Sequence, residues 1–214
     1  MKLKYDLIIF DLDGVLLDTV DMKTQVFAKM FEKYGPEVVQ KINEYNKKYG
    51  GKSRGEKFRY YYTHILHKTL TEEIYDDLCL QYSSMTLKPS IDAPSIPGVN
   101  EFLEAHYKDN TFMVVSAVEH NDLQLIIKKR KMSKYFKVVF GSPPGKVSII
   151  KEIISANYYN RSNLLYIGDS LSDWEACKVV GCDFLGVTKT STFPSNIPVI
   201  KDFVELKNNL AGVI

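Results

Sequence analysis

Two carboxylates follow a short apolar segment near the amino terminus: residues 5–10 lead into Asp11 and Asp13, and Gly14 comes next. With one residue between them, the two acidic side chains can lean toward the same side of an extended backbone. Such a pair suits phosphoryl transfer, because one ionised carboxylate can attack phosphorus while the other protonates the departing alkoxide. Mg²⁺ prefers oxygen ligands and would screen the repulsion between carboxylate and phosphate. A lone Asp-x-Asp is, however, more often a polar loop that closes a strand.

Two further residues are placed to bind phosphate oxygens. Ser116 ends the apolar segment 111–116, where its hydroxyl and nearby backbone amides, that of Ala117 included, could hold an anion at a strand-to-helix junction. Lys146 opens the helical stretch 146–157, an unfavourable place for a cation unless it balances acids and a phosphate. Taken singly, such a serine is more often a helix cap and such a lysine a solvated surface residue.

A second pair of acids, Asp169 and Asp173, follows the apolar segment 163–167. Asp169 is placed to join Asp11 around a cation. Asp173 lies about one helical turn further on and could bind a metal-held water or orient the site. As an isolated string, the same residues could form a capped helix start.

The elements that must position these residues follow from apolar periodicity. We expect buried strands at residues 5–10, 111–116, 137–140, 163–167 and 183–187, and helices at 99–107, 123–131, 146–157 and 172–180. This alternation predicts an α/β fold, a Rossmann-like parallel sheet with helices on both faces. The carboxyl ends of its strands then meet at one edge, where ligands of such sheets bind.

Residues 19–87 interrupt the alternation with helical segments and no convincing strand. We therefore expect two units: a core domain formed by residues 1–18 and 88–214, and an inserted all-helical domain of four helices, residues 19–87. The proline-containing segment 88–98 would return the chain to the sheet.

Four strings in order, DLDG at residue 11, Ser116 after an apolar strand, Lys146 at a helix start, and GDSLSD from residue 168, resemble the motifs of the haloacid dehalogenase superfamily. The resemblance spans nearly the whole chain and implies that Asp11 is the nucleophile and Asp13 the acid and base. It also implies Mg²⁺ bound by Asp11, the Asp13 backbone carbonyl and Asp169, with Asp173 in support.

In such family members a helical insert serves as a cap over the site. The layout is most similar to phosphoglycolate phosphatases and β-phosphoglucomutases, and Ser53-Arg54 resembles the mutase string that reaches the distal part of the substrate. Arg54 could clamp a carboxylate or second phosphate there, or simply belong to a solvated helix start.

Hydrolysis is favoured over isomerisation, because Lys23 stands where the mutases usually carry a histidine and the fourth motif reads GDS rather than EDS. A β-phosphoglucomutase-like phosphomutase is the first alternative. A signalling or binding module phosphorylated on Asp11 is the second.

Composition limits the classes of partner that the chain is expected to bind. The net charge of +2, from 28 basic and 26 acidic residues, gives no field for holding nucleic acid. Three cysteines without a CxxC pair indicate neither a zinc site nor a disulfide framework. No apolar stretch reaches the roughly 18 to 20 residues of a membrane span. We expect a cytoplasmic monomer or homodimer acting on a small phosphorylated metabolite.

Overall fold

Strand β1 (Leu7–Phe10) is apolar at every position because helices cover both faces of the sheet to which it belongs. Ile8 and Phe10 pack into one core cluster, whereas Leu7 and Ile9 pack into another on the opposite face. This alternation is the two-residue period of a strand. The computed structural model describes residues 3–157, 159–188 and 193–208.

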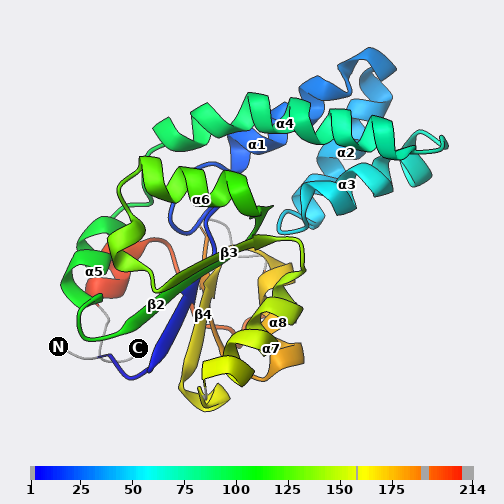
Figure 1. Ribbon diagram of the computed structural model, residues 1–214. Helices are drawn as coiled ribbons and strands as arrows, with labels where there is room; N and C mark the ends of the chain where they lie inside the picture. The colour runs from blue at the N-terminus through cyan, green and yellow to red at the C-terminus, as the bar shows by residue number, and fades with distance from the viewer. Residues whose placement is uncertain (1–2, 158, 189–192, 209–214) are drawn as a thin grey trace.

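The sheet has six parallel strands in the order β3-β2-β1-β4-β5-β6, with β1 at its centre (Figure 1). The other strands are β2 (Thr111–Glu119), β3 (Val138–Ser142), β4 (Leu164–Gly168), β5 (Asp183–Val187) and β6 (Val199–Ile200). The predicted α/β fold with a parallel sheet is confirmed. Sequence analysis missed β6, since a two-residue strand has no readable period.

Two groups of helices cover the sheet (Figure 1). One face carries α5 (Val99–His106), α6 (His120–Lys129) and α9 (Phe203–Asn208), and the other carries α7 (Lys146–Asn157) and α8 (Leu171–Val180). Short helical turns occupy Glu32–Tyr34, Tyr61–Ile65, Ser133–Tyr135 and Arg161–Asn163. The predicted placement of helices on both faces is therefore also confirmed.

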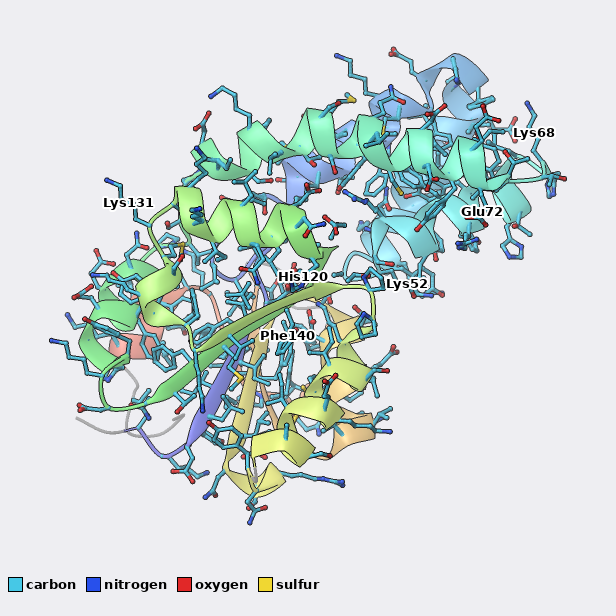
Figure 2. The ribbon with its side chains drawn as sticks, viewed as in Figure 1. Lys52, Lys68, Glu72, His120, Lys131 and Phe140 are labelled. Carbon is cyan, nitrogen blue, oxygen red and sulfur yellow. The ribbon has the colours of Figure 1, made fainter. Side chains whose placement is uncertain are left out.

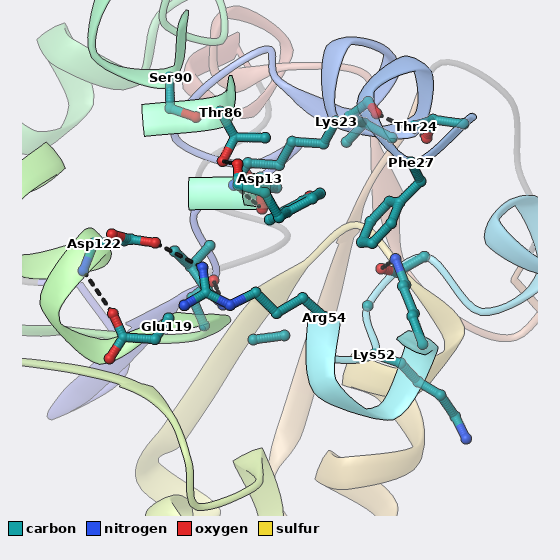
Figure 3. Close-up of a pocket in the computed structure, with 18 of the residues that line it drawn as sticks. Asp13, Lys23, Thr24, Phe27, Lys52, Arg54, Thr86, Ser90, Glu119 and Asp122 are labelled. Carbon is teal, nitrogen blue, oxygen red and sulfur yellow. Dashed lines mark hydrogen bonds and ion pairs between the residues drawn. The ribbon is translucent and has the colours of Figure 1, made fainter. Parts of the chain in front are cut away.

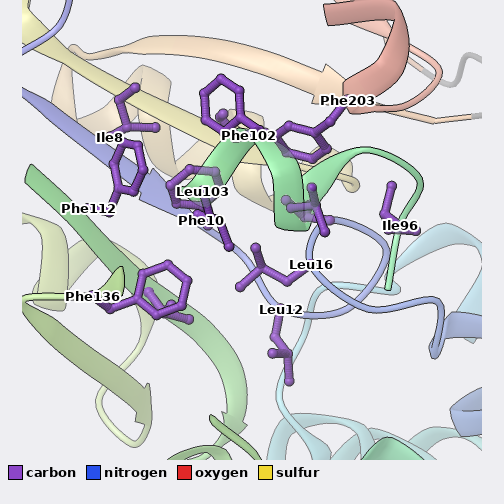
Figure 4. Packing of buried hydrophobic residues seen from close by; sticks show 14 of the residues in the cluster. Ile8, Phe10, Leu12, Leu16, Ile96, Phe102, Leu103, Phe112, Phe136 and Phe203 are labelled. Carbon is purple, nitrogen blue, oxygen red and sulfur yellow. The ribbon is translucent and has the colours of Figure 1, made fainter. Parts of the chain in front are cut away.

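Aromatic side chains fix the end of β1 from the α5 side. The ring of Phe10 lies edge-on to that of Phe112, with 5.2 Å between the ring centroids, and also packs against the rings of Phe102 and Phe203 (Figure 4). Such pairs contribute roughly 0.5 to 1.5 kcal/mol each beyond the area they bury. The residue that follows Phe10 is therefore held by a rigid support.

The inserted residues form four α-helices: α1 (Val20–Met30), α2 (Pro36–Lys48), α3 (Arg54–Tyr60) and α4 (Glu72–Asp92). They surround an aromatic cluster of their own that includes Phe27, Phe58 and Tyr61. Figure 2 shows Lys68 and Glu72 at the end of this helical unit remote from the sheet, and Lys52 at the end nearest to it.

Helix α4 extends into the segment that was expected to return the chain to the sheet. Helix α4 continues through Pro89 to Asp92, so the expected boundary at residue 87 falls inside a helix. Proline removes one helical hydrogen bond, but Leu87 and Ile91 pack against the core cluster and keep this turn helical. We propose that the helical unit extends to about Asp92.

In the part of the chain that the structure describes, no helix is long and apolar enough to cross a membrane.

Candidate active site

Three of the predicted site residues come from the centre of the sheet. Asp11 follows β1, Ser116 lies in β2, and Asp169 follows β4. Phe10 pairs with Val114 on one side and Ile167 on the other, so Asp11, Ser116 and Asp169 lie within two residues of the same level of the sheet, although β2 itself continues to Glu119. Parallel pairing thus brings together side chains that are far apart in the sequence.

Lys146 links two of the acids in a buried ion network. Its Nζ lies 2.7 Å from Oδ2 of Asp11 and 2.5 Å from Oδ1 of Asp173. All three side chains are buried, and that of Asp173 is 0% exposed. Burial alone would lower the pKa of Lys146, but Asp11 and Asp173 outweigh it and raise that pKa above its ordinary value. The lysine is therefore a permanent cation in the site.

The buried acids suit a divalent cation. One carboxylate oxygen from each of Asp11, Asp169 and Asp173 lies within 4.8 Å of the others. Burial, then repulsion from neighbouring carboxylates, raises the pKa of Asp169 well above its usual value, and burial raises the pKa of Asp11 to about 6. A cation would relieve this repulsion, and an all-oxygen ligand set is the kind that Mg²⁺ prefers. The residues therefore fit a magnesium site.

The turn after β1 lies directly against Asp169, one of these three acids. Gly14 has φ +72°, and a Cβ at this position would lie 2.5 Å from Oδ2 of Asp169. Glycine is required both by the backbone conformation and by the close approach of the carboxylate.

Asp13 lies beside this group of three acids, and its side chain has other partners. Thr19 Oγ1 donates to Oδ1 of Asp13 at 2.5 Å, and Lys23 Nζ lies 2.7 Å from both carboxylate oxygens. Lys23, noted in the sequence where the mutases carry histidine, is therefore the counter-ion of Asp13 (Figure 3).

Ser116 and Ala117 lie where the pairing of β2 with β3 is interrupted. The register shifts between Val115 and Glu119, so the backbone of this stretch leaves the regular ladder. Both residues line the same pocket as Asp11 and Asp13, and the Ser116 side chain accepts a hydrogen bond from the Val118 amide at 3.3 Å. This geometry suits binding of an anion by a hydroxyl and backbone amides.

Of the two residues predicted to contact substrate from the helical unit, Ser53 has a local structural role. It caps α3 in a reciprocal capping box with Glu56, its hydroxyl donating to Oε2 of Glu56 at 2.8 Å. The described residues that line the pocket of Asp11 and Asp13 do not include Ser53.

Arg54 does line that pocket and is not solvated, its side chain being 15% exposed. Its NH1 group donates to Oδ2 of Asp122, in the first turn of α6, at 2.8 Å (Figure 3). The same NH1 group donates to the hydroxyl of Ser83, on α4, at 2.6 Å. The guanidinium therefore connects the helical unit with the core.

A family model described as haloacid dehalogenase-like hydrolase matches residues 8–187, which include all the acids and the lysine of the buried network. The chain belongs to the haloacid dehalogenase-like hydrolases. No curated protein matches it.

Solved structures share the fold of this chain at low sequence identity. A mutant of CbbY from Rhodobacter sphaeroides in complex with xylulose-(1,5)bisphosphate is 15% identical, with a TM-score of 0.76 and coverage of 94% of this chain and 96% of that one. A predicted phosphoglycolate phosphatase from Haemophilus somnus 129PT is 19% identical, with a TM-score of 0.72 and coverage of 97% and 98%. The magnesium-bound HAD-hydrolase YfnB from Bacillus subtilis is 15% identical, with a TM-score of 0.72 and coverage of 97% and 99%.

Two pocket residues of this haloacid dehalogenase-like hydrolase escaped sequence analysis. Lys57 lies on α3, one turn after Arg54, and Asp122 lies in the first turn of α6; both line the pocket. The Ser53-x-x-Glu56 string marks the start of α3 and could have indicated that Arg54 and Lys57 share a helix face. No sequence pattern pairs Arg54 with Asp122, because that contact depends on where the first turn of α3 lies relative to the first turn of α6.

Proposed function

We propose that this chain is a Mg²⁺-dependent phosphatase that hydrolyses a small phosphorylated metabolite through an aspartyl-phosphate intermediate. The observation that carries the proposal is the buried contact of Lys146 with Asp11 at the edge of the sheet where Ser116 and Asp169 also lie. A nucleophile, a fixed cation in contact with it and anion-binding groups beside both are the elements that phosphoryl transfer requires.

In the first step a carboxylate oxygen of Asp11 attacks phosphorus. The ester bond breaks, its electron pair passes to the leaving oxygen, and that oxygen takes a proton from Asp13. Because Asp13 is ion-paired with Lys23 in this structure, it must first take up a proton from solvent and exchange its contact with Lys23 for the leaving group. Lys146 and Ser116, together with the amide of Ala117, hold the phosphoryl oxygens.

In the second step Asp13, now a carboxylate, takes a proton from water as the water oxygen attacks phosphorus. The bond between phosphorus and Asp11 breaks, which releases inorganic phosphate and restores both carboxyl groups to their starting states. The same residue thus serves as acid and then as base.

Asp11, Asp169 and Asp173, with the backbone carbonyl of Asp13, would hold the Mg²⁺ ion. When bound, the ion supplies positive charge that screens repulsion between the Asp11 carboxylate and the incoming phosphate. Similar structures support this choice, since one is described as bound to magnesium.

The substrate class proposed is a sugar phosphate or a phosphoglycolate-like compound. The support is that fold relatives include a predicted phosphoglycolate phosphatase and a complex with a sugar bisphosphate. The helical unit covers the pocket and would act as a cap that excludes water and selects the substrate.

Turnover of p-nitrophenyl phosphate with Mg²⁺ tests the proposal, with Asp11→Asn as the comparison. We expect steady multiple turnover by the wild-type chain, and loss of turnover by a variant that is still folded by circular dichroism. Retained activity in the variant would refute the role of Asp11. A single stoichiometric phosphorylation without turnover would instead support the signalling module. With a hexose 1-phosphate as the substrate in place of p-nitrophenyl phosphate, a hexose phosphate isomer as the product would support the mutase.

A further inference from the structure

Lys57 is a buried cation that faces the pocket. The residue is 6% exposed, and its side chain lies over the ring of Phe27 with Nζ 4.9 Å from the ring centroid. Its Nζ donates one hydrogen bond, to the carbonyl oxygen of Gly50 at 2.8 Å. Among the described residues, no carboxylate lies within ion-pair distance of this ammonium group. Buried lysines are rarely left without a counter-ion.

The other cations around the same pocket are accounted for. Lys23 is paired with Asp13, and Arg54 is paired with Asp122. Lys52 lines the pocket, but its ammonium group points away from Asp13 and Arg54 (Figure 3). Among the described residues that line this pocket, Lys57 is thus the buried cation without a carboxylate at ion-pair distance, whereas Lys52 is only partly buried.

The electrostatics of Lys57 agree with this picture. Burial lowers the pKa of Lys57 to about 8, against an opposing effect of Asp13. At neutral pH the amine is still mostly protonated, and an anion that entered the pocket would favour the charged form further. A cation held in this way forms a stronger hydrogen bond to an anion than a solvated lysine does.

We propose that Lys57, rather than Arg54, binds a second anionic group of the substrate, a carboxylate or a second phosphate carried by the leaving group. This inference rests on the proposed phosphatase function. Asp13 must face the leaving oxygen, so the rest of the leaving group occupies the pocket that Asp13 and Lys57 both line. The preferred substrates are therefore phosphomonoesters with a second negative charge a few bonds from the ester oxygen.

The simpler alternative is that Lys57 only fixes the turn at Gly50 through its hydrogen bond. That role would affect all substrates alike, because it involves no contact with the leaving group. Discrimination between an anionic and a neutral leaving group separates the two roles.

The experiment measures equilibrium binding by calorimetry, with Mg²⁺ present, in the inactive Asp11→Asn background. The probes are 2-phosphoglycolate, with a carboxylate tail, xylulose 1,5-bisphosphate, with a phosphate tail, and 2-hydroxyethyl phosphate, with a neutral tail. Lys57→Met removes the charge while retaining the length of the side chain. Lys47→Met removes the same charge from an exposed position on α2 and is the matched control.

We expect Lys57→Met to reduce the preference for an anionic over the neutral tail by about tenfold or more, as loss of a charge-assisted hydrogen bond implies. Lys47→Met should leave that preference as it is. The probe whose preference falls identifies the tail as carboxylate or phosphate. Equal weakening of all three probes by Lys57→Met, or no preference for an anionic tail in the parent, would overturn the proposal. Because binding is measured without turnover, these outcomes are independent of p-nitrophenyl phosphate hydrolysis by the wild-type chain, which tests the phosphatase function itself.

Discussion

The Nζ atom of Lys146 lies 2.7 Å from Oδ2 of Asp11, although 135 residues separate the two in the chain. The same nitrogen also contacts Asp173, so one cation compensates two buried carboxylates. Removing one partner of a buried ion network leaves uncompensated charge, which is more damaging than never having built the network.

Lys146→Met should therefore lower both stability and activity. We expect the free energy of unfolding to fall by about 3 to 5 kcal/mol and kcat for p-nitrophenyl phosphate to fall by roughly 100-fold or more. Lys151→Met, on the exposed side of the same helix, is the control. Urea unfolding and steady-state kinetics give the two quantities, and similar behaviour of the two variants would contradict the assigned role.

The raised pKa of Asp11 predicts how stability depends on pH without metal. Burial raises this pKa from 3.8 to about 6, so between these values the folded state binds more protons than the unfolded state. The contribution of Asp11 to stability is thus fully present below about pH 4 and is lost as the pH rises through about 6. In EDTA, the melting temperature of the wild-type chain relative to Asp11→Asn should fall across this window.

Mg²⁺ should reverse that trend, because it binds the ionised carboxylates and stabilises the folded state that contains them. We expect the ion to raise the melting temperature of the wild-type chain more at pH 7.5 than at pH 5. Asp11→Asn should show a smaller rise at both values. An equal Mg²⁺ effect on both proteins at both pH values would argue against a metal site at Asp11.

The contact of Arg54 with Asp122 joins the helical unit to the core and should be energetically coupled. Both side chains are largely buried, at 15% and 18% exposed. A double-mutant cycle with Arg54→Ala and Asp122→Ala, followed by denaturant unfolding, should give a coupling energy of about 1 kcal/mol or more. The exposed pair Arg59 and Glu72, 4.0 Å apart, should give close to zero and is the control. Equal coupling energies in the two pairs would show that the contact of Arg54 with Asp122 does not stabilise the packing of the helical unit on the core.

The sequence alone could predict which residues of the candidate site meet at the edge of the sheet, because those residues follow or end predicted strands. Asp11, Ser116 and Asp169 each stand at the carboxyl end of an apolar run, and parallel pairing alone places such ends together. Lys57 and the Arg54–Asp122 contact could not be predicted in this way. They depend on where α3 of the helical unit lies relative to the pocket and to α6, and no periodicity along the chain encodes the distance between elements of different units.

The continuation of α4 through Pro89 shows a second limit of prediction from the sequence. Local chemistry favours a break at proline, and sequence reasoning ended the helical unit there. Packing of Leu87 and Ile91 against the core cluster is a tertiary effect, and it outweighs the lost hydrogen bond. The boundary of an inserted unit is therefore less predictable than the residues at the ends of buried strands.

Gly51 brings the loop before α3 against the fourth motif, and this close approach yields the final prediction. A Cβ at Gly51 would clash with the hydroxyl groups of Ser170 and Ser172. Ser170 in turn donates to Oδ2 of Asp173 at 2.6 Å, so a displaced serine would disturb an acid that Lys146 holds in the site.

Gly51→Ala should therefore force the loop away from the sheet or shift Asp173. Either change should reduce kcat/KM by roughly tenfold or more, since displacements near 1 Å are enough to impair catalysis. Gly50→Ala is the matched control, because its Cβ would meet only the backbone oxygen of Asn46 at an ordinary 3.5 Å. We expect the control to have the much smaller effect on kcat/KM, with both variants folded by circular dichroism. If the two alanines proved equally harmful, loss of backbone freedom rather than contact with the fourth motif would explain the result.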